Sequence, residues 1–349
     1  MEKHLIKQIV QKGISKPAAL CSLVQWKGSV PRKDYPWMIV DKNKSIIGTI
    51  GGGRMEYLTI RAAFECLRKN LIQLHEFDMS STDPLGQSSV CGGKTLVLIE
   101  PILDTNEITF IAIQNAIDNK INAVLITQLD GNTKITVKRK LISEKTGFYE
   151  YPKIVAEKAV KLLKNGGSVT VTRGNELFLI QPIKPDPILH IFGAGHVGRS
   201  VAKLAHFLEL QVNIYDNRKE IATKERFPDA NKIFSDDYGL NELEKEIHKN
   251  DFLFIATHGH QNDLHLLKSL INYKVAYIGL MCSKNKWRVL SRALLDEGIN
   301  ANQINKIFAP VGISIGSETV PEIAVSILAE IINHYRHGNS GSMSLTQNI

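Results

Sequence analysis

A glycine-rich turn constrains the fold of this chain more than any other segment. The stretch HIFGAGHVGRS, residues 190–200, contains the pattern G-x-G-x-x-G at Gly193, Gly195 and Gly198. An apolar run precedes the pattern, a segment with helical periodicity follows it, and Asp216 ends the next apolar run. In dinucleotide-binding folds such glycines let backbone N–H groups approach a pyrophosphate, and the acidic residue accepts ribose hydroxyls. The pattern predicts a Rossmann-like parallel sheet in which Asp216 disfavours a 2′-phosphate.

The remaining sequence patterns indicate an α/β chain of two domains. Residues 189–337 alternate short apolar runs with helical segments, which is typical of a parallel α/β domain. Residues 1–181 combine amphipathic helices with hairpin patterns, such as the turn at Asp130-Gly131, and predict a mixed α+β domain. Three prolines in QPIKPDP indicate a linker at 182–188, and the polar segment 338–349 predicts a disordered tail.

Composition and charge exclude several classes of protein. The 43 Lys+Arg against 35 Asp+Glu give a net charge of +8, which suits an anionic ligand or an acidic partner surface. The basic residues form no long block, so we expect no nucleic-acid binding. The N-terminus has no signal-peptide pattern and no apolar run reaches the length of a membrane span, so we expect no membrane association. Four scattered cysteines without a CxxC pair predict a cytoplasmic protein.

The segment THGHQND has two interpretations. His258, His260 and Asp263 follow the strand-like run DFLFIAT, where parallel sheets bind ligands, so they suit a metal or acid–base cluster. Alternatively the segment is a helix start capped by Asn262 or Asp263, with the histidines as polar loop residues. Spacing alone favours the second interpretation, because a metal would need a further ligand from elsewhere.

The segment GISIG, residues 312–316, matches the G-x-S-x-G pattern of hydrolases. That pattern requires a strand, a sharp turn and a helix around the serine. Here Ser314 follows Ala309-Pro310 and leads into a helix with Pro321 in its first turn. The segment therefore predicts a glycine-rich loop before a helix, and Ser314 is not expected to be a nucleophile.

Three consecutive glycines, Gly51 to Gly53, directly precede a helical segment in GTIGGGRMEY. The first amides of that helix, together with Arg54, form a candidate anion site, and Glu56 lies in the first turn. The alternative is a glycine bend at the end of a strand.

A second glycine-flanked segment, SSVCGGKT, places Cys91 directly before Gly92 and Gly93. A thiol beside glycines can approach a ligand closely, and a thiolate is a soft donor that binds transition metals or carries sulfur. The alternative is a cysteine in an ordinary turn.

Together these segments resemble the XdhC/CoxI family, the accessory proteins that mature xanthine dehydrogenase and related molybdenum hydroxylases. The N-terminal resemblance rests on GTIGGGRME and CGGKTLVLIEP, and the more extensive C-terminal one on LHIFGAGHVGRSVAKLA, VNIYDNR, ERFPDA, THGHQND, YIGLMCSKNK and APVGISIGSETVPEIAVSILAEII. The chain departs from the family pattern at Val90, where many relatives have a second cysteine, and at Cys282, where a glycine is usual.

The resemblance implies a cofactor-handling chaperone without catalytic residues. Such proteins bind molybdenum cofactor, with or without its nucleotide, keep it intact during sulfuration and insert it into the apo form of a hydroxylase such as xanthine dehydrogenase. A cysteine desulfurase is implied as a further partner, and we expect a homodimer. The implied cofactor-binding residues are Gly51, Gly52, Gly53, Glu56, Cys91, Gly92, Gly93, Gly193, Gly195, His196, Gly198, Asp216, Arg218, His258 and Asp263. Cys91 is also the implied metal ligand, and we expect it near the Gly193 turn in a site between the domains.

Two other functions fit the same residues. The chain is an NAD-dependent oxidoreductase if the turn binds NAD, although no separate substrate domain with a proton donor is apparent. It is a regulatory sensor if it binds a nucleotide and a partner without chemistry. Three possibilities therefore stay open for the ligand of the Gly193–Gly198 turn: the nucleotide of the cofactor, NAD, or no ligand.

Overall fold

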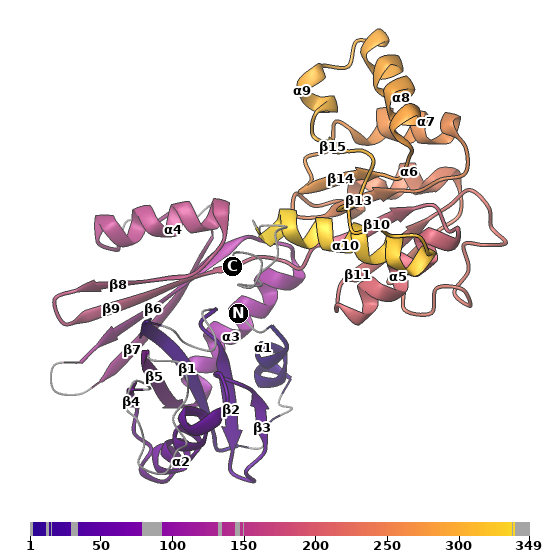
Figure 1. Cartoon of the computed structure of the whole chain (residues 1–349). Coiled ribbons are helices and arrows are strands. Elements are labelled where there is room, and N and C mark those ends of the chain that lie inside the picture. The colour runs from indigo at the N-terminus through magenta and orange to yellow at the C-terminus, as the bar shows by residue number, and fades with distance from the viewer. Residues whose placement is uncertain are drawn as a thin grey trace, which may run out of the picture. The chain divides into compact units, whose positions relative to one another are not determined.

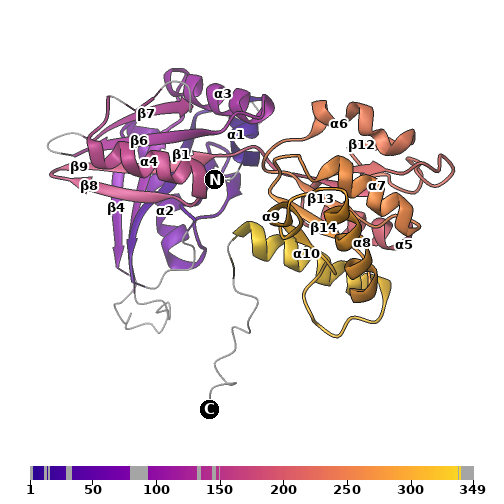
Figure 2. The same ribbon diagram turned by 90° about the horizontal axis from the view of Figure 1, so that it is seen from above.

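The computed structural model describes residues 3–11, 14, 16–28, 34–78, 93–131, 135–143, 147–148, 150–336 and 338. The chain divides into two compact units, Met1–Pro185 and Asp186–Ile349 (Figures 1 and 2). The division falls within residues 182–188, although the last strand of the first unit continues to Ile183. Apart from residue 338, the predicted tail lies outside the described residues.

The first unit contains a five-stranded antiparallel sheet in the order β3-β2-β1-β5-β4. Its strands are β1 (Ala18–Lys27), β2 (Trp37–Asp41), β3 (Ile46–Gly48), β4 (Gln73–Asp78) and β5 (Lys94–Pro101). β1 is apolar along most of its length and almost entirely buried, because it lies at the centre of the sheet and pairs with β2 and β5.

The first unit also contains a four-stranded antiparallel sheet in the order β7-β6-β9-β8. Its strands are β6 (Ala123–Asp130), β7 (Thr136–Ser143), β8 (Val169–Arg173) and β9 (Glu176–Ile183). The hairpin predicted at Asp130-Gly131 is confirmed, since Asp130 pairs with Thr136. The mixed α+β character of this part is confirmed as well, whereas the sequence did not indicate how the strands are ordered.

Within the described part of the first unit, four helices cover these sheets. They are α1 (Lys3–Val10), α2 (Gly53–Lys69), α3 (Asp104–Asp118) and α4 (Lys153–Asn165). α2 packs Met55 and Cys66 against the five-stranded sheet, and α4 packs Val155 against the four-stranded one. Leu5 of α1 and Phe110 of α3 share a core with strands of both sheets, so the two sheets belong to one folded unit.

The second unit is a six-stranded parallel sheet in the order β12-β11-β10-β13-β14-β15, which confirms the predicted Rossmann-like domain. Its strands are β10 (Ile188–Phe192), β11 (Gln211–Tyr215), β12 (Lys232–Phe234), β13 (Phe252–Ile255), β14 (Tyr277–Leu280) and β15 (Ile307–Phe308). The chain runs outward from β10 to β12 and then crosses to β13 on the other side of β10. The carboxyl ends of β10 and β13 therefore form the switch point where such sheets bind ligands.

Helices cover both faces of the parallel sheet (Figure 1). They are α5 (His196–Phe207), α6 (Leu240–Glu246), α7 (His260–Leu270), α8 (Lys284–Asp296), α9 (Ala301–Ile304) and α10 (Val320–Arg336). α5 and α10 bury Val201 and Ile327 on one face, and α7 and α8 bury Leu266 and Leu290 on the other. No helix within the described ranges is both long and apolar enough to cross a membrane.

Candidate functional site

The predicted C-terminal site residues converge at the carboxyl edge of the parallel sheet. The Gly193–Gly198 turn follows β10, Asp216 and Arg218 follow β11, and Asp263 lies in the first turn of the helix after β13. Because β11, β10 and β13 are neighbours in the sheet, segments far apart in the sequence meet at this edge.

The three glycines of the turn have different physical roles. Gly193 has a φ of 124°, and a Cβ there would lie 2.2 Å from the carbonyl oxygen of Ala256. A Cβ at Gly198 would lie 1.9 Å from the carbonyl oxygen of Gly193, so this glycine permits close packing of helix and turn. A Cβ at Gly195 would meet nothing within 4 Å. Gly193 and Gly198 are therefore needed for close backbone packing. At Gly195, by contrast, the position that a side chain would occupy is open space.

That open space lies at the N-terminus of α5. Gly195 is the N-cap of the helix, no side chain caps its first amides, and its first turn contains no acidic residue. His196 starts the helix and is exposed. Uncapped amides and the positive end of the helix dipole favour an anion at this position.

Asp216 bonds the end of β11 to the turn. Its Oδ2 accepts the backbone N–H of Ala194 at 2.7 Å, and the Arg218 Nε and Nη2 atoms donate to its two oxygens at 2.9 and 2.8 Å. The carboxylate is 1% exposed. Burial alone would raise its pKa, but the hydrogen bonds from Arg218 and from the two backbone N–H groups outweigh it and lower the pKa below its ordinary value. Asp216 is thus ionised and engaged with the protein itself, which differs from the free ribose acceptor expected from the sequence.

Arg226 is a residue of this site that belongs to none of the sequence motifs. Its Nη2 donates to the carbonyl oxygen of Ala194 at 3.3 Å. The backbone N–H of Ala194 is thus bound by Asp216 and its carbonyl oxygen by Arg226. Its Nε is buried and has no hydrogen-bond partner within the described residues. The segment ERFPDA carried part of the family resemblance, but its spacing gave no reason to select the arginine.

Asp263 is buried in the first turn of α7 and forms a charged cluster. It is 0% exposed, accepts a hydrogen bond from Thr257 Oγ1, and lies 2.5 Å from Lys286 Nζ. The negative charges of both Asp216 and Asp263 act on the buried hydroxyl of Tyr238. Burial, followed by the negative charge of Asp216, raises the pKa of Tyr238, while its hydrogen bond with Thr257 lowers it. The sequence singled out neither Tyr238 nor Thr257.

The capping interpretation of THGHQND is wrong in its details. The N-cap of α7 is Gly259, with a φ of 101° and no side-chain cap. Asn262 Nδ2 instead donates to the carbonyl oxygen of His258 at 2.9 Å, and His258 is an exposed loop residue. Within the part of the chain that the structure describes, no three His, Cys, Asp or Glu side chains are placed to hold a metal ion.

The N-terminal glycine motif encloses a carboxylate of the chain itself. Glu56 Oε2 accepts hydrogen bonds from the backbone N–H groups of Ile50 and Gly52, both at 3.1 Å, and from Thr49 Oγ1 at 2.5 Å. Gly51 to Gly53 all have positive φ, which suits glycine and explains the triplet. Glu56 thus fixes the loop before α2, whereas the anion site expected at the first helical amides and Arg54 stays a prediction.

Cys91 and Gly92 lie outside the described residues, and Gly93 is buried directly before β5. The metal-ligand role of Cys91 and its proximity to Gly193 thus stay predictions. Of the other cysteines, Cys21 and Cys66 are buried and Cys282 is half-buried, all as free thiols. Burial raises the pKa of Cys282, and Lys286 opposes this effect.

Ser314 occupies an exposed loop between β15 and α10. This loop is bonded to α10, since Gly312 N–H donates to Glu330 Oε1 at 3.1 Å and Ser326 Oγ donates to the carbonyl oxygen of Ile313 at 2.6 Å. The expected glycine-rich loop is confirmed, and Pro321 lies in the first turn of α10.

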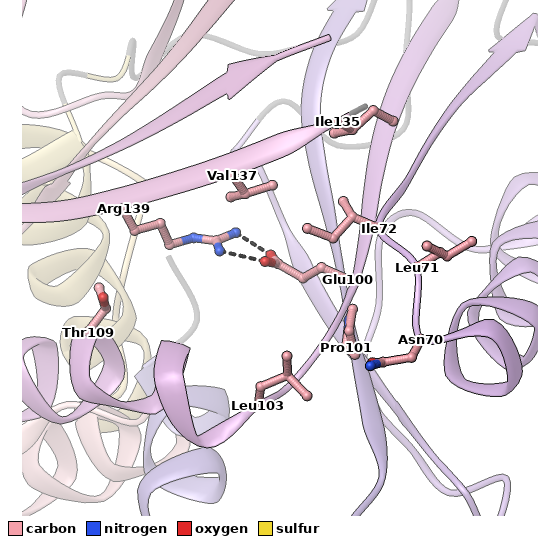
Figure 3. A pocket seen from close by; sticks show the side chains of 10 residues that line it. All are labelled: Asn70, Leu71, Ile72, Glu100, Pro101, Leu103, Thr109, Ile135, Val137 and Arg139. Atoms are coloured by element: carbon pink, nitrogen blue, oxygen red, sulfur yellow. Dashed lines mark hydrogen bonds and ion pairs between the residues drawn. The ribbon is translucent and has the colours of Figure 1, made fainter. Parts of the chain in front are cut away.

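The first unit also contains a pocket of about 410 Å³ beside a buried ion pair (Figure 3). Arg139 of β7 donates to both carboxylate oxygens of Glu100 on β5, and the two side chains are 5% and 4% exposed. The pocket is lined by Asn70, Leu71, Ile72, Glu100, Pro101, Leu103, Thr109, Ile135, Val137 and Arg139. The pair joins the two sheets of the unit, and the sequence did not indicate it.

Comparisons with known proteins agree with the resemblance. Residues 189–331 match the XdhC Rossmann domain, and residues 15–78 match the XdhC and CoxI family. A Bacillus subtilis (strain 168) protein, named as a probable xanthine dehydrogenase subunit, is 27% identical over 320 residues, which are 90% of this chain and 92% of that protein.

The chain is also similar to a longer relative and to a protein of known crystal structure. The Escherichia coli (strain K12) protein named uncharacterized protein YqeB is 26% identical over 94% of this chain, which spans only 45% of that relative's length. A crystal structure described as a xanthine dehydrogenase from Bacillus halodurans has a TM-score of 0.78 at 24% identity, with 99% of each chain covered, and shares the fold. Since the two matched segments together cover more than half of the sequence, the chain belongs to the XdhC and CoxI family and contains its Rossmann domain.

Proposed function

We propose that this protein binds molybdenum cofactor and assists its sulfuration and its insertion into xanthine dehydrogenase or a related molybdenum hydroxylase. The observation that carries the proposal is the open space at Gly195, directly before the uncapped N-terminus of α5. A relative that spans almost the same length is named as a probable subunit of xanthine dehydrogenase, which supports the association with that enzyme.

The residues at the turn fit the phosphate end of a pyranopterin. The amides after Gly195 offer uncharged donors, and Arg218 and Arg226 bring two guanidinium groups to the turn. Arginine binds phosphate through paired N–H donors, so this donor set suits a phosphate ester. In this proposal Cys91 holds the metal end as a soft thiolate ligand. When bound, the cofactor supplies the molybdenum centre of the client enzyme, and the protein supplies a protected site.

The two alternative functions make different demands on the same site. An NAD-dependent oxidoreductase requires an acceptor for the ribose diol, yet both oxygens of Asp216 already accept two hydrogen bonds each. A regulatory sensor would bind a nucleotide but neither pterin nor molybdenum. The partners that the proposal includes are the client hydroxylase, a cysteine desulfurase and a second copy of the chain.

Anaerobic binding of molybdenum cofactor, read by pterin fluorescence and molybdenum content, tests the proposal. We expect tight binding by the wild type, weaker binding by Cys91→Ala, and unchanged binding by a Cys66→Ser control whose thiol lies on the buried face of α2. If neither the wild type nor the variants bind the cofactor while NADH binds, the oxidoreductase or the sensor replaces this proposal.

A further inference from the structure

The acceptor capacity of Asp216 is fully used. Its Oδ1 accepts the backbone N–H of Arg218 at 3.0 Å and Nε at 2.9 Å, and its Oδ2 accepts the N–H of Ala194 at 2.7 Å and Arg218 Nη2 at 2.8 Å. A carboxylate offers about four acceptor positions. Asp216 therefore has no acceptor left for the hydroxyls of a ribose.

The group that faces solvent at the end of β11 is instead the guanidinium of Arg218. Its side chain is 36% exposed, whereas that of Asp216 is 1% exposed. Nε and Nη2 are held by the carboxylate, and Nη1 donates to no residue among those described. Asp216 thus orients the guanidinium N–H donors of Arg218 at the end of β11. In dinucleotide-binding folds an acidic residue at this position accepts the hydroxyls of the ribose diol.

The charges around Arg218 are of both signs, since the carboxylate of Glu220 also acts on its guanidinium. Arg226 brings a second guanidinium to Ala194, and its buried Nε has no hydrogen-bond partner within the described residues. The neighbouring Lys219 is paired with Asp236 at 2.8 Å and contributes little net charge. The N–H donors of Arg218 and Arg226 that no described residue accepts favour a ligand that carries negative charge at this position.

We propose that Arg218, oriented by Asp216, makes the β11 end of the Rossmann turn a subsite for a phosphate monoester rather than for a ribose diol. This inference rests on the proposed function only in that the same turn holds the ligand. The phosphate has two sources with the same chemistry, namely the 2′-phosphate of a dinucleotide and the terminal phosphate of a pyranopterin. The preference is opposite to the one that the acidic residue suggests from the sequence alone.

Two matched pairs of ligands test the subsite on the full-length protein. The first pair is NADPH and NADH, which differ only in the 2′-phosphate, and the second is molybdopterin before and after anaerobic phosphatase treatment. We expect the phosphorylated member of at least one pair to bind about tenfold more tightly to the wild type. Discrimination in the first pair identifies a nucleotide as the occupant, and discrimination in the second identifies the pterin phosphate. Discrimination in neither pair overturns the inference, even if the cofactor itself binds.

Variants assign the discrimination to one side chain. Arg218→Gln should reduce the preference to less than about twofold, while Arg218→Lys should retain part of it, because the charge stays and the fork of donors is lost. Lys219→Gln is the matched control, since it removes one positive charge at the next position and should leave the preference unchanged. A preference that survives in Arg218→Gln contradicts the inference, and the wild-type comparison remains decisive if that variant does not fold.

Discussion

The carboxylate of Asp216 lies 2.7 Å from the backbone nitrogen of Ala194, so the end of β11 is hydrogen-bonded to the turn that follows β10. The same carboxylate binds the guanidinium of Arg218. One buried residue thereby fixes both the backbone at the sheet edge and the orientation of a solvent-facing cation.

Replacing this carboxylate should destabilise the second unit. Asp216→Asn keeps the shape of the side chain but loses the charge that strengthens the bonds from Ala194 and Arg218. Since a hydrogen bond to a charged group contributes about 1.5–3 kcal/mol, we expect a loss of that order in the free energy of unfolding. Urea unfolding at pH 7 measures it, with the exposed Asp236→Asn as a control that should change little. Equal effects of the two substitutions would contradict the role assigned to Asp216.

The lowered pKa of Asp216 predicts an acid dependence of stability. Its folded-state pKa lies below the ordinary value of 3.8, so its contribution is fully present above that value and is lost as the pH falls through the folded-state pKa. The wild-type free energy of unfolding should therefore decline more steeply with falling pH below about 4 than that of Asp216→Asn. Parallel pH profiles of the two proteins would show that Asp216 titrates alike in the folded and unfolded states.

The buried pair of Glu100 and Arg139 predicts a strong effect of single substitutions. Breaking a buried ion pair leaves one charge without compensation, which costs about 3–5 kcal/mol. We expect Arg139→Met and Glu100→Leu each to lower the stability of the first unit by this order, and the double variant Glu100→Leu/Arg139→Met to recover much of the loss. Chemical denaturation of the three proteins tests this coupling. Losses that simply add would indicate that the two side chains act independently.

The buried thiols should be inert in the folded protein. Burial, together with the nearby negative charge of Glu100, raises the pKa of Cys66 to about 12, and burial also raises that of Cys21. Because the thiolate is the reactive form, we expect no alkylation of either residue by iodoacetamide at pH 8 before denaturation. Peptide mapping by mass spectrometry after timed labelling reads both sites. Labelling of Cys21 at the rate of a free cysteine would contradict the packing of β1.

The sequence predicted those elements whose cause is local. The glycines of the Gly193 turn, the alternation of strands and helices after residue 188, and the hairpin at Asp130-Gly131 each leave a short-range pattern. The order of the strands within the two antiparallel sheets leaves no such short-range pattern, because it depends on which apolar faces pack together. The pairing of Glu100 with Arg139 is likewise invisible, since the two residues are separated by 39 positions and meet only through those sheets.

The site shows the same division between local and tertiary causes. The pattern identified Gly195 and Asp216, but the saturation of Asp216 depends on the side chain of Arg218 and on the amide of Ala194 folding back from another strand. Arg226 reaches the turn from a segment 32 residues away from Ala194 and carries no spacing signal. Glu56 was identified as a ligand-binding residue, yet it binds the loop amides itself because the three preceding glycines bend the backbone around it.

The most direct test of the account is the affinity of molybdenum cofactor for wild-type protein and for Gly195→Ala, measured anaerobically by pterin fluorescence. Gly195 has a φ of −70° that alanine adopts without strain, and its new Cβ would meet only the open space before α5. Gly131→Ala is the control, because a Cβ there also meets nothing within 4 Å but lies in the first unit. We predict at least tenfold weaker binding by Gly195→Ala, about 1.4 kcal/mol, and unchanged binding by the control. Equal affinity of all three proteins would contradict the assignment of the cofactor phosphate to the Rossmann turn.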